Sequence, residues 1–300
     1  MPLLPIRKKL TPAHVVVAFA LTTGLALCAA QTPSVPAGEL VRRTVTNELN
    51  ANNGAARYMF MDYKQTPRGS QAKLMVETRD AMVGLIVANN GHPLNEQERK
   101  AEYARVERFI HDPDELRKKQ KQEKENDERI TRIMKALPDA FLYDYDGTQP
   151  GQQGIGKPGE TLLRIKFRPN PKYDPPSHVE QVLTGMQGHL LVDPQRDRIA
   201  MIDGTLAEQV SFGWGFLGHL DRGGHFLVEQ GDIGDDSWEV TRMNLSFTGK
   251  ILLFKSLSIQ SQEVSSHFQK VPSSLTFGQG LDLLKKQEAQ LAENGFSHGK

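Results

Sequence analysis

Residues 197–230 read DRIAMIDGTLAEQVSFGWGFLGHLDRGGHFLVEQ, and large and small side chains alternate in the middle of this stretch. The large apolar residues share one parity: Val210, Phe212, Trp214 and Phe216. Ser or Gly stands between each pair, so the pattern predicts a β-strand with one apolar face and one nearly bare face. A bare face lets another strand, a helix or a ligand approach the backbone closely. The Asp-Arg-Gly-Gly sequence at 221–224 predicts a turn, so we interpret the whole stretch as strands of one sheet.

Strand patterns separated by turn residues extend over most of the chain. Apolar stripes predict helices at residues 38–50 and 277–293. Strands are predicted at residues 56–65, 73–78, 82–88, 141–146, 161–167, 185–192, 198–203, 226–229, 238–247, 251–259 and 264–268. The Thr-Gly-Lys sequence at 248–250 predicts a tight turn between two of them. Many consecutive strands joined by short turns, with helices at both ends, predict one antiparallel α+β domain over residues 31–300.

Residues 94–137 differ from the rest because charged and amide side chains dominate them. Tyr103, Val106, Phe109 and Ile110 indicate one amphipathic helix, and a second ends in a stripe that includes Ile133. No aliphatic or aromatic residue occurs between Leu116 and Ile130. We interpret the segment as a helical insertion into the sheet that packs only through its two ends. Its charge run is typical of a solvated helix, with a partner-docking surface as the alternative.

The first thirty residues have the layout of a bacterial secretory signal. Three basic residues precede an apolar run that ends in Cys28-Ala-Ala-Gln, and the run is too short for a comfortable membrane span. We therefore expect a periplasmic or secreted protein with no transmembrane span after signal removal. Cys28 is the only cysteine, and lipidation there would anchor the protein in the envelope. Leu27 disfavours that alternative because a lipobox carries Gly, Ala or Ser before the cysteine.

The charge balance excludes a broad electrostatic attraction to nucleic acid. The chain has 37 Lys and Arg residues, of which three lie in the first thirty residues, so 34 remain against 36 Asp and Glu. A nearly neutral domain lacks the excess of positive charge that binds the phosphate backbone of nucleic acids. We expect no nucleic-acid partner.

No motif in the chain predicts a cofactor, a metal or a catalytic group. Residues 151–157 match the first seven positions of a P-loop, but Pro158 replaces the Ser or Thr that reaches magnesium, and a predicted strand follows. His219, Asp221 and His225 lie close in sequence without the spacing of a zinc site. A hydrolase of unrecognised type that uses His219, Asp221 or His225 is one alternative function.

Aromatic residues on predicted strands are the stronger indication. A curved sheet that does not fill itself would present them to an apolar ligand, and an ordinary core is the alternative. The candidate lining residues are Tyr58, Phe60, Phe212, Trp214, Phe216, Phe226 and Trp238.

Three segments carry a resemblance to a known family. They are GHLLVD at 188–193, RIAMIDG at 198–204 and the Gly-rich stretch around Trp214. With the terminal helices and the export signal, they make residues 36–284 similar to the LolA-like periplasmic lipoprotein-carrier superfamily, within a group of uncharacterised secreted bacterial proteins. The resemblance implies a strongly curved antiparallel sheet, an unclosed barrel that binds acyl chains under a helical lid.

These observations favour a non-enzymatic binding or chaperone-like protein with an apolar cavity for lipid or a lipoprotein acyl chain. A second hypothesis is an envelope scaffold or regulatory protein that docks a protein partner through the charged helical hairpin. The two differ in whether the sheet encloses a cavity or a filled core.

Overall fold

The computed structural model describes residues 35–51, 56–212, 217–235, 237–251 and 255–294. Residues 34–300 form one compact unit. The predicted signal segment with Cys28, and the predicted lining residues Trp214 and Phe216, lie outside the described residues.

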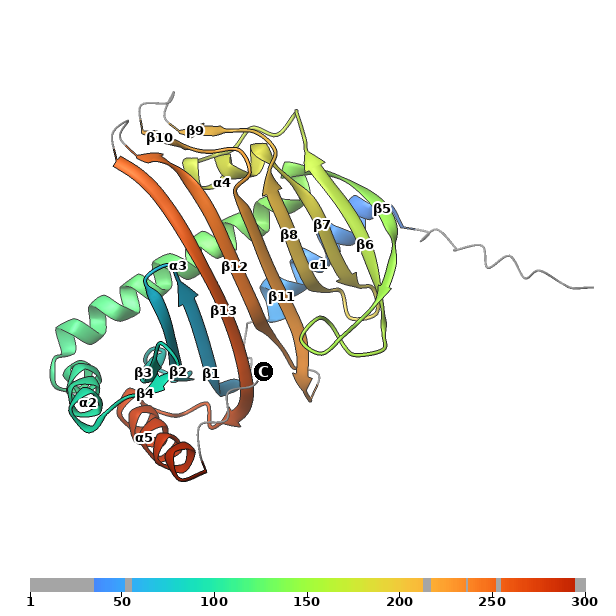
Figure 1. Cartoon of the computed structure of the whole chain (residues 1–300). Helices are drawn as coiled ribbons and strands as arrows, with labels where there is room; N and C mark the ends of the chain where they lie inside the picture. Colours follow the sequence, from blue (N-terminus) through green and yellow to red (C-terminus); the bar gives the residue numbers. More distant parts are fainter. Residues whose placement is uncertain (1–34, 52–55, 213–216, 236, 252–254, 295–300) are drawn as a thin grey trace, which may run out of the picture. The chain divides into compact units, whose positions relative to one another are not determined.

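Five α-helices, one short 3-10 helix and thirteen strands occur within these described ranges (Figure 1). The helices are α1 (Ala37–Ala51), α2 (Glu96–His111), α3 (Pro113–Ala140), α4 (His178–Gln181), η1 (Val182–Gly185) and α5 (Phe277–Asn294). The first strands are β1 (Arg57–Thr66), β2 (Gly69–Val76), β3 (Val83–Asn89), β4 (His92–Pro93), β5 (Phe141–Pro150) and β6 (Thr161–Pro169). The remaining strands are β7 (Met186–Asp193), β8 (Arg198–Leu206), β9 (Val210–Phe212), β10 (Gly218–Leu220), β11 (His225–Gly234), β12 (Ser237–Ile251) and β13 (Lys255–Val271).

All described strands belong to one curved antiparallel sheet. Its order is β4-β3-β2-β1-β13-β12-β11-β8-β7-β6-β5, and β10 pairs with the end of β12 and with β9. Strands β4 and β5 are the two edges and do not pair with each other, so the sheet is not closed. The predicted α+β fold with a curved, open antiparallel sheet is confirmed.

The helical insertion connects the two edges of this sheet. The chain leaves edge strand β4, forms α2 and α3, and enters edge strand β5. Asn95 and Glu98 form a capping box at the start of α2, and Asp112 caps α3 just before Pro113. Because α3 has 28 residues, it is long enough to extend from one half of the sheet to the other.

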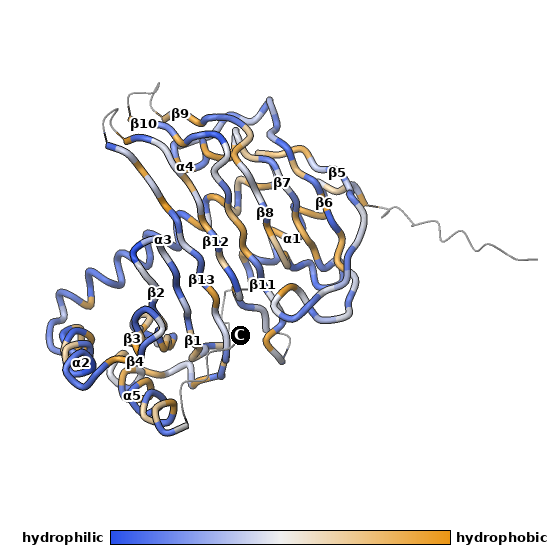
Figure 2. The backbone as a smooth tube through the Cα atoms, in the orientation of Figure 1, coloured by the Kyte–Doolittle hydropathy of each residue, from blue (hydrophilic) through white to orange (hydrophobic). Residues whose placement is uncertain are grey.

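The two larger of three hydrophobic clusters lie against different halves of the sheet. The first contains α1, the C-terminal end of α3 and strands β5 to β8, with Leu190, Ile199 and Leu206 almost fully buried. The second contains β1 to β3, α2 and α5, with Leu85 and Leu281 at its centre. Helix α3 contributes Leu116 to the second cluster and Leu137 to the first. Figure 2 shows that the helix between these ends is largely hydrophilic.

The predicted turn at residues 248–250 is wrong. Strand β12 continues through Gly249 to Ile251, and β13 is one strand of 17 residues where the sequence predicted two. A Cβ at Gly249 would lie 2.1 Å from the backbone oxygen of His219 on β10. The glycine therefore permits a close approach of two strands rather than a reversal of the chain.

Candidate functional site

An apolar cavity of about 410 Å³ lies between the C-terminal part of α3 and the sheet. Helix α3 contributes Ile133, Met134 and Leu137, and α4 with η1 contributes four residues beside it. The sheet side is formed by Phe141, Tyr143, Phe167, Met186, Leu190, Ile202, Phe212, Leu220, Phe226, Leu245, Phe247 and Ile259. The cavity therefore joins one face of strands β5 to β13 to a helical cover.

Strand periodicity explains why so many elements contribute to one wall. Successive side chains of a strand point to opposite faces, so Leu245 and Phe247 of β12 share the face that lines the cavity. Ile259 lies opposite Phe247 in the β12–β13 pair and faces the same way. The helices do not fully cover this apolar face of the sheet. Space therefore remains between the sheet and α3.

Only Tyr143 and His178 bring polar side-chain groups to the described lining. The Tyr143 hydroxyl donates to the backbone oxygen of Leu137 at 2.6 Å, and burial raises the pKa of this hydroxyl well above its usual range. His178 is exposed on α4, where its Nδ1 lies 3.2 Å from Gln181 Oε1. The interior of the cavity therefore offers no charged group to a ligand. The imidazole of His178 lies at the side of the cavity that faces solvent.

The structure brings two of the predicted lining residues, Phe212 and Phe226, into this cavity. Tyr58 and Phe60 lie on β1 and pack against Phe268, with ring centroids 6.4 and 5.3 Å apart. Trp238 is buried in a separate cluster that includes Leu162 and Leu191. These three residues do not line the cavity.

Most of the lining was not singled out by the sequence analysis. Aliphatic residues and methionines such as Met134, Met186 and Leu245 form much of it, and they look like ordinary core residues in a sequence. The apolar stripe at the end of the charged insertion, which includes Ile133, was the available signal for the helical cover.

The histidines considered for catalysis belong to separate pairs. His225 Nε2 lies 2.7 Å from Asp203 Oδ1, and His219 Nε2 lies 3.3 Å from Asp221 Oδ1. The Thr248 hydroxyl donates to Asp221 at 2.7 Å. Over the described part of the chain, no group of three His, Cys, Asp or Glu residues is arranged to hold a metal.

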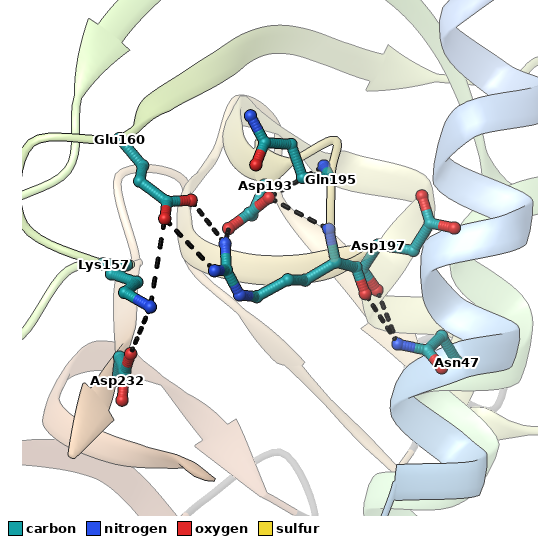
Figure 3. Close-up of polar contacts among 8 residues, drawn as sticks. Asn47, Lys157, Glu160, Asp193, Gln195, Asp197 and Asp232 are labelled. Atoms are coloured by element: carbon teal, nitrogen blue, oxygen red, sulfur yellow. Dashed lines mark hydrogen bonds and ion pairs between the residues drawn. The ribbon is translucent and has the colours of Figure 1, made fainter. Parts of the chain in front are cut away.

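The P-loop-like segment takes part in a polar network at the other end of the same strands (Figure 3). Lys157 lies 3.7 Å from Asp232 and 4.0 Å from Glu160. Arg196 pairs with Glu160 and also with Asp193, which is 1 % exposed. The segment is followed by strand β6 rather than a helix, so it lacks the helix N-terminus of a phosphate site. Its charged residues hold three hairpin connections together.

The charged N-terminal part of α3 forms several ion pairs within the helix. Arg117 with Asp114, Lys118 with Glu115 and Lys119 with Glu123 are ion pairs within the helix. Glu123 also accepts from the Met82 amide at 3.3 Å. These pairs are what a solvated helix carries on its surface.

The comparison with protein-family models and the comparison with curated proteins each find no match to this chain. Within the described ranges, no helix is both long and apolar enough to cross a bilayer.

Proposed function

We propose that this protein is an exported binding protein without enzymatic activity, and that it takes an acyl chain of a lipid or lipoprotein into the cavity beneath α3. The observation that carries the proposal is the cavity of about 410 Å³, whose described lining is apolar apart from Tyr143 and His178.

The chemistry of the lining favours an apolar occupant. Ligand sites are typically clefts of about 300 to 1,000 Å³ with mainly hydrophobic walls, and this cavity falls in that range. Ordered water needs two to four polar partners, which the interior of this lining does not supply. An unfilled space of this size also forfeits dispersion contacts of the side chains around it. A ligand that buries methylene groups there would recover those contacts.

The position of His178 favours a ligand that has an apolar chain and a polar headgroup at one end. The His178 side chain is exposed on α4 beside the cavity, whereas the Tyr143 hydroxyl is already bonded to Leu137. A charged head would stay near the solvent side, because no cation in the interior lining would compensate it. The resemblance to LolA-like carriers supports the same arrangement, with an acyl chain under a helical lid.

The proposal places the protein in the periplasm or outside the cell, on the basis of its first thirty residues. A lipid anchor at Cys28 is the alternative location. Neither location changes the chemistry of the cavity.

Native mass spectrometry of the full chain, purified from cells without detergent, tests the proposal. We expect mass increments that disappear on organic extraction and that are identified in the extract as acyl lipids. Protein that carries no lipid, and that also fails to take up an added fatty-acid or phospholipid probe, would overturn the proposal.

A further inference from the structure

The apolar face of the β12–β13 hairpin continues beyond the cavity to the end of the hairpin. The pairing of these strands is continuous from Arg242 opposite Val264 to Ile251 opposite Lys255. Alternation therefore places Ile251 on the same face as the cavity residues Leu245 and Phe247. On β13, Leu257 and Ile259 lie on this face as well. An apolar strip thus leads out of the cavity along both strands.

Exposed apolar side chains lie along this strip and beside its end. Ile251 is 39 % exposed, Ile259 is 40 % exposed and Leu217 is 48 % exposed. These are three of the seven large hydrophobic residues exposed among the described residues, and they come from adjacent strands or their ends. Gly218, which follows Leu217, lies opposite Ile251 in the β10–β12 pair. Clusters of exposed apolar residues mark interaction sites more often than single ones do.

The charge at this end is positive. From Met243 to Gln262 the chain contains no acidic residue, and it contains two lysines, Lys250 and Lys255. Both are exposed, and Lys255 lies directly opposite Ile251. On the neighbouring turn Arg222 is exposed, while the carboxylate of Asp221 is engaged by Thr248 and His219. Apolar side chains between lysines are complementary to an anionic lipid surface, which offers hydrocarbon beneath phosphate groups.

The backbone at this end is closely packed, so these side chains are held in place. A Cβ at Gly218 would lie 2.1 Å from the Lys250 backbone oxygen, and a Cβ at Gly249 would lie equally close to His219. Strands β10, β12 and β13 therefore form a continuous sheet up to the residues that carry the exposed groups.

We propose that this end of the hairpin docks on an anionic phospholipid bilayer. Ile251 and Leu217 enter the interface, and Lys250 and Lys255 meet headgroup phosphates. Leu257 and Ile259 then continue the apolar path from the bilayer to the cavity. The docking rests on exposure and charge alone, whereas the path rests on the proposed function of the cavity.

Vesicle flotation with the full chain tests the docking. The vesicles contain phosphatidylcholine alone or phosphatidylcholine mixed with phosphatidylglycerol. We expect the protein to float with the phosphatidylglycerol vesicles, less at high salt because the lysine contribution is screened. A Lys250→Gln/Lys255→Gln variant should bind these vesicles about thirtyfold more weakly, since each lysine near an anionic surface contributes about 1 kcal/mol. Ile251→Asp should weaken binding by about tenfold or more.

Two control variants carry the same changes elsewhere on these strands and on β6. Val240 lies on β12 near its other end and is 41 % exposed, so Val240→Asp matches Ile251→Asp. Exposed Lys270 of β13 and Lys166 of β6, changed together to Gln, match the double lysine variant. Both controls should bind like the unaltered protein, and urea unfolding checks that all variants fold.

The proposal is overturned if the protein binds neither kind of vesicle, or if Val240→Asp weakens binding as much as Ile251→Asp. It is also overturned if the protein does not bind vesicles but self-associates, and Ile251→Asp abolishes that self-association. The surface would then be an interface between two copies of the chain. Co-bound lipid without vesicle binding would overturn this docking and leave the cavity proposal standing. Vesicle binding by a protein that carries no lipid and also takes up no added fatty-acid or phospholipid probe would overturn the cavity proposal and leave this docking standing.

Discussion

Phe247 of β12 lies directly opposite Ile259 of β13, and both side chains form part of the cavity wall beneath α3. The pair belongs to the longest hairpin among the described strands, which joins the half of the sheet covered by α1 to the half covered by α2 and α5. A change on this face of the hairpin therefore reaches the cavity and the edge of the first hydrophobic cluster, against which Phe247 packs.

Filling the cavity should block the ligand. Val182 lies on η1, lines the cavity and is only partly buried, so a Val182→Trp side chain can occupy the open space. We expect the affinity for a fluorescent fatty-acid probe to fall by about tenfold or more, which corresponds to about 1.4 kcal/mol of lost contact. The unfolding midpoint should stay near that of the unaltered protein. Val240→Trp, on the exposed part of β12, should change neither quantity, and equal probe binding by both variants would contradict the assigned site.

Arg196 should matter for stability because one of its partners is fully buried. Asp193 is 1 % exposed and lies 3.0 Å from Arg196 Nη1, with Glu160 on the same guanidinium. Arg196→Met leaves that carboxylate without its cation, which costs about 3 kcal/mol. Urea unfolding measures the loss. Arg42→Met removes an exposed ion pair with Asp139 and should cost less than about 1 kcal/mol. Similar losses in the two variants would mean that the network in Figure 3 does not hold its hairpin connections.

Glu239 should make stability fall as the pH rises. Burial is the largest cause that raises the pKa of Glu239 to about 7; the nearby Glu77 carboxylate also raises it, and Arg198 lowers it. The folded protein then keeps a proton that the unfolded chain, with an ordinary carboxyl pKa, releases above about pH 4.5. Its stabilising contribution is therefore complete at low pH and is lost between about pH 4.5 and 7.

A Glu239→Gln variant removes this titration. Above pH 7 it should be more stable than the unaltered protein by about 1 to 3 kcal/mol, with a smaller or no advantage near pH 4.5. Unfolding free energies measured in urea at several pH values test the difference. If the gap between the two proteins does not change with pH, burial does not raise the pKa of this carboxyl.

The sequence predicted the sheet better than the cavity, and the reason is physical. Period-two patterns such as the alternation from Val210 to Phe216 predict which side chains share a face, and the hairpin order follows from short turns. Whether a face is filled depends on what covers it. Met134 and Met186 are far apart in sequence and meet only because α3 crosses from one edge of the sheet to the other. Gly249 shows the same limit of sequence-based prediction. The sequence does not distinguish a glycine that lets two strands approach closely from a glycine in a turn.

The part of β3 that the two-residue edge strand β4 does not pair is protected by side chains of α2, a feature with no signature in the sequence. Glu102 accepts from the Ile86 amide at 2.8 Å, and Arg105 donates to the Gly84 oxygen at 3.1 Å. The pair thus replaces the hydrogen bonds of a missing neighbouring strand. Glu102→Ala should cost about 1 to 3 kcal/mol and expose an edge that favours aggregation. Light scattering during mild heating measures the aggregation, and Glu96→Ala, which removes an exposed pair on the same helix, should leave it unchanged. Equal aggregation of the two variants would argue against edge protection.

Gly249 should tolerate no side chain. Because its Cβ would lie 2.1 Å from the His219 backbone oxygen, Gly249→Ala must separate β10 from β12, at a cost of about 1 to 3 kcal/mol. Hydrogen exchange should show faster exchange of the Asp221 amide, which donates to Thr248 across these strands. Gly278→Ala is the matched control, since its Cβ would meet only Ile110 at 3.8 Å near the start of α5. That variant should be neutral or slightly more stable because alanine favours a helix over glycine. Unchanged exchange at Asp221 in Gly249→Ala would show that the strand pair can accommodate a methyl group, and the close approach would not explain the glycine.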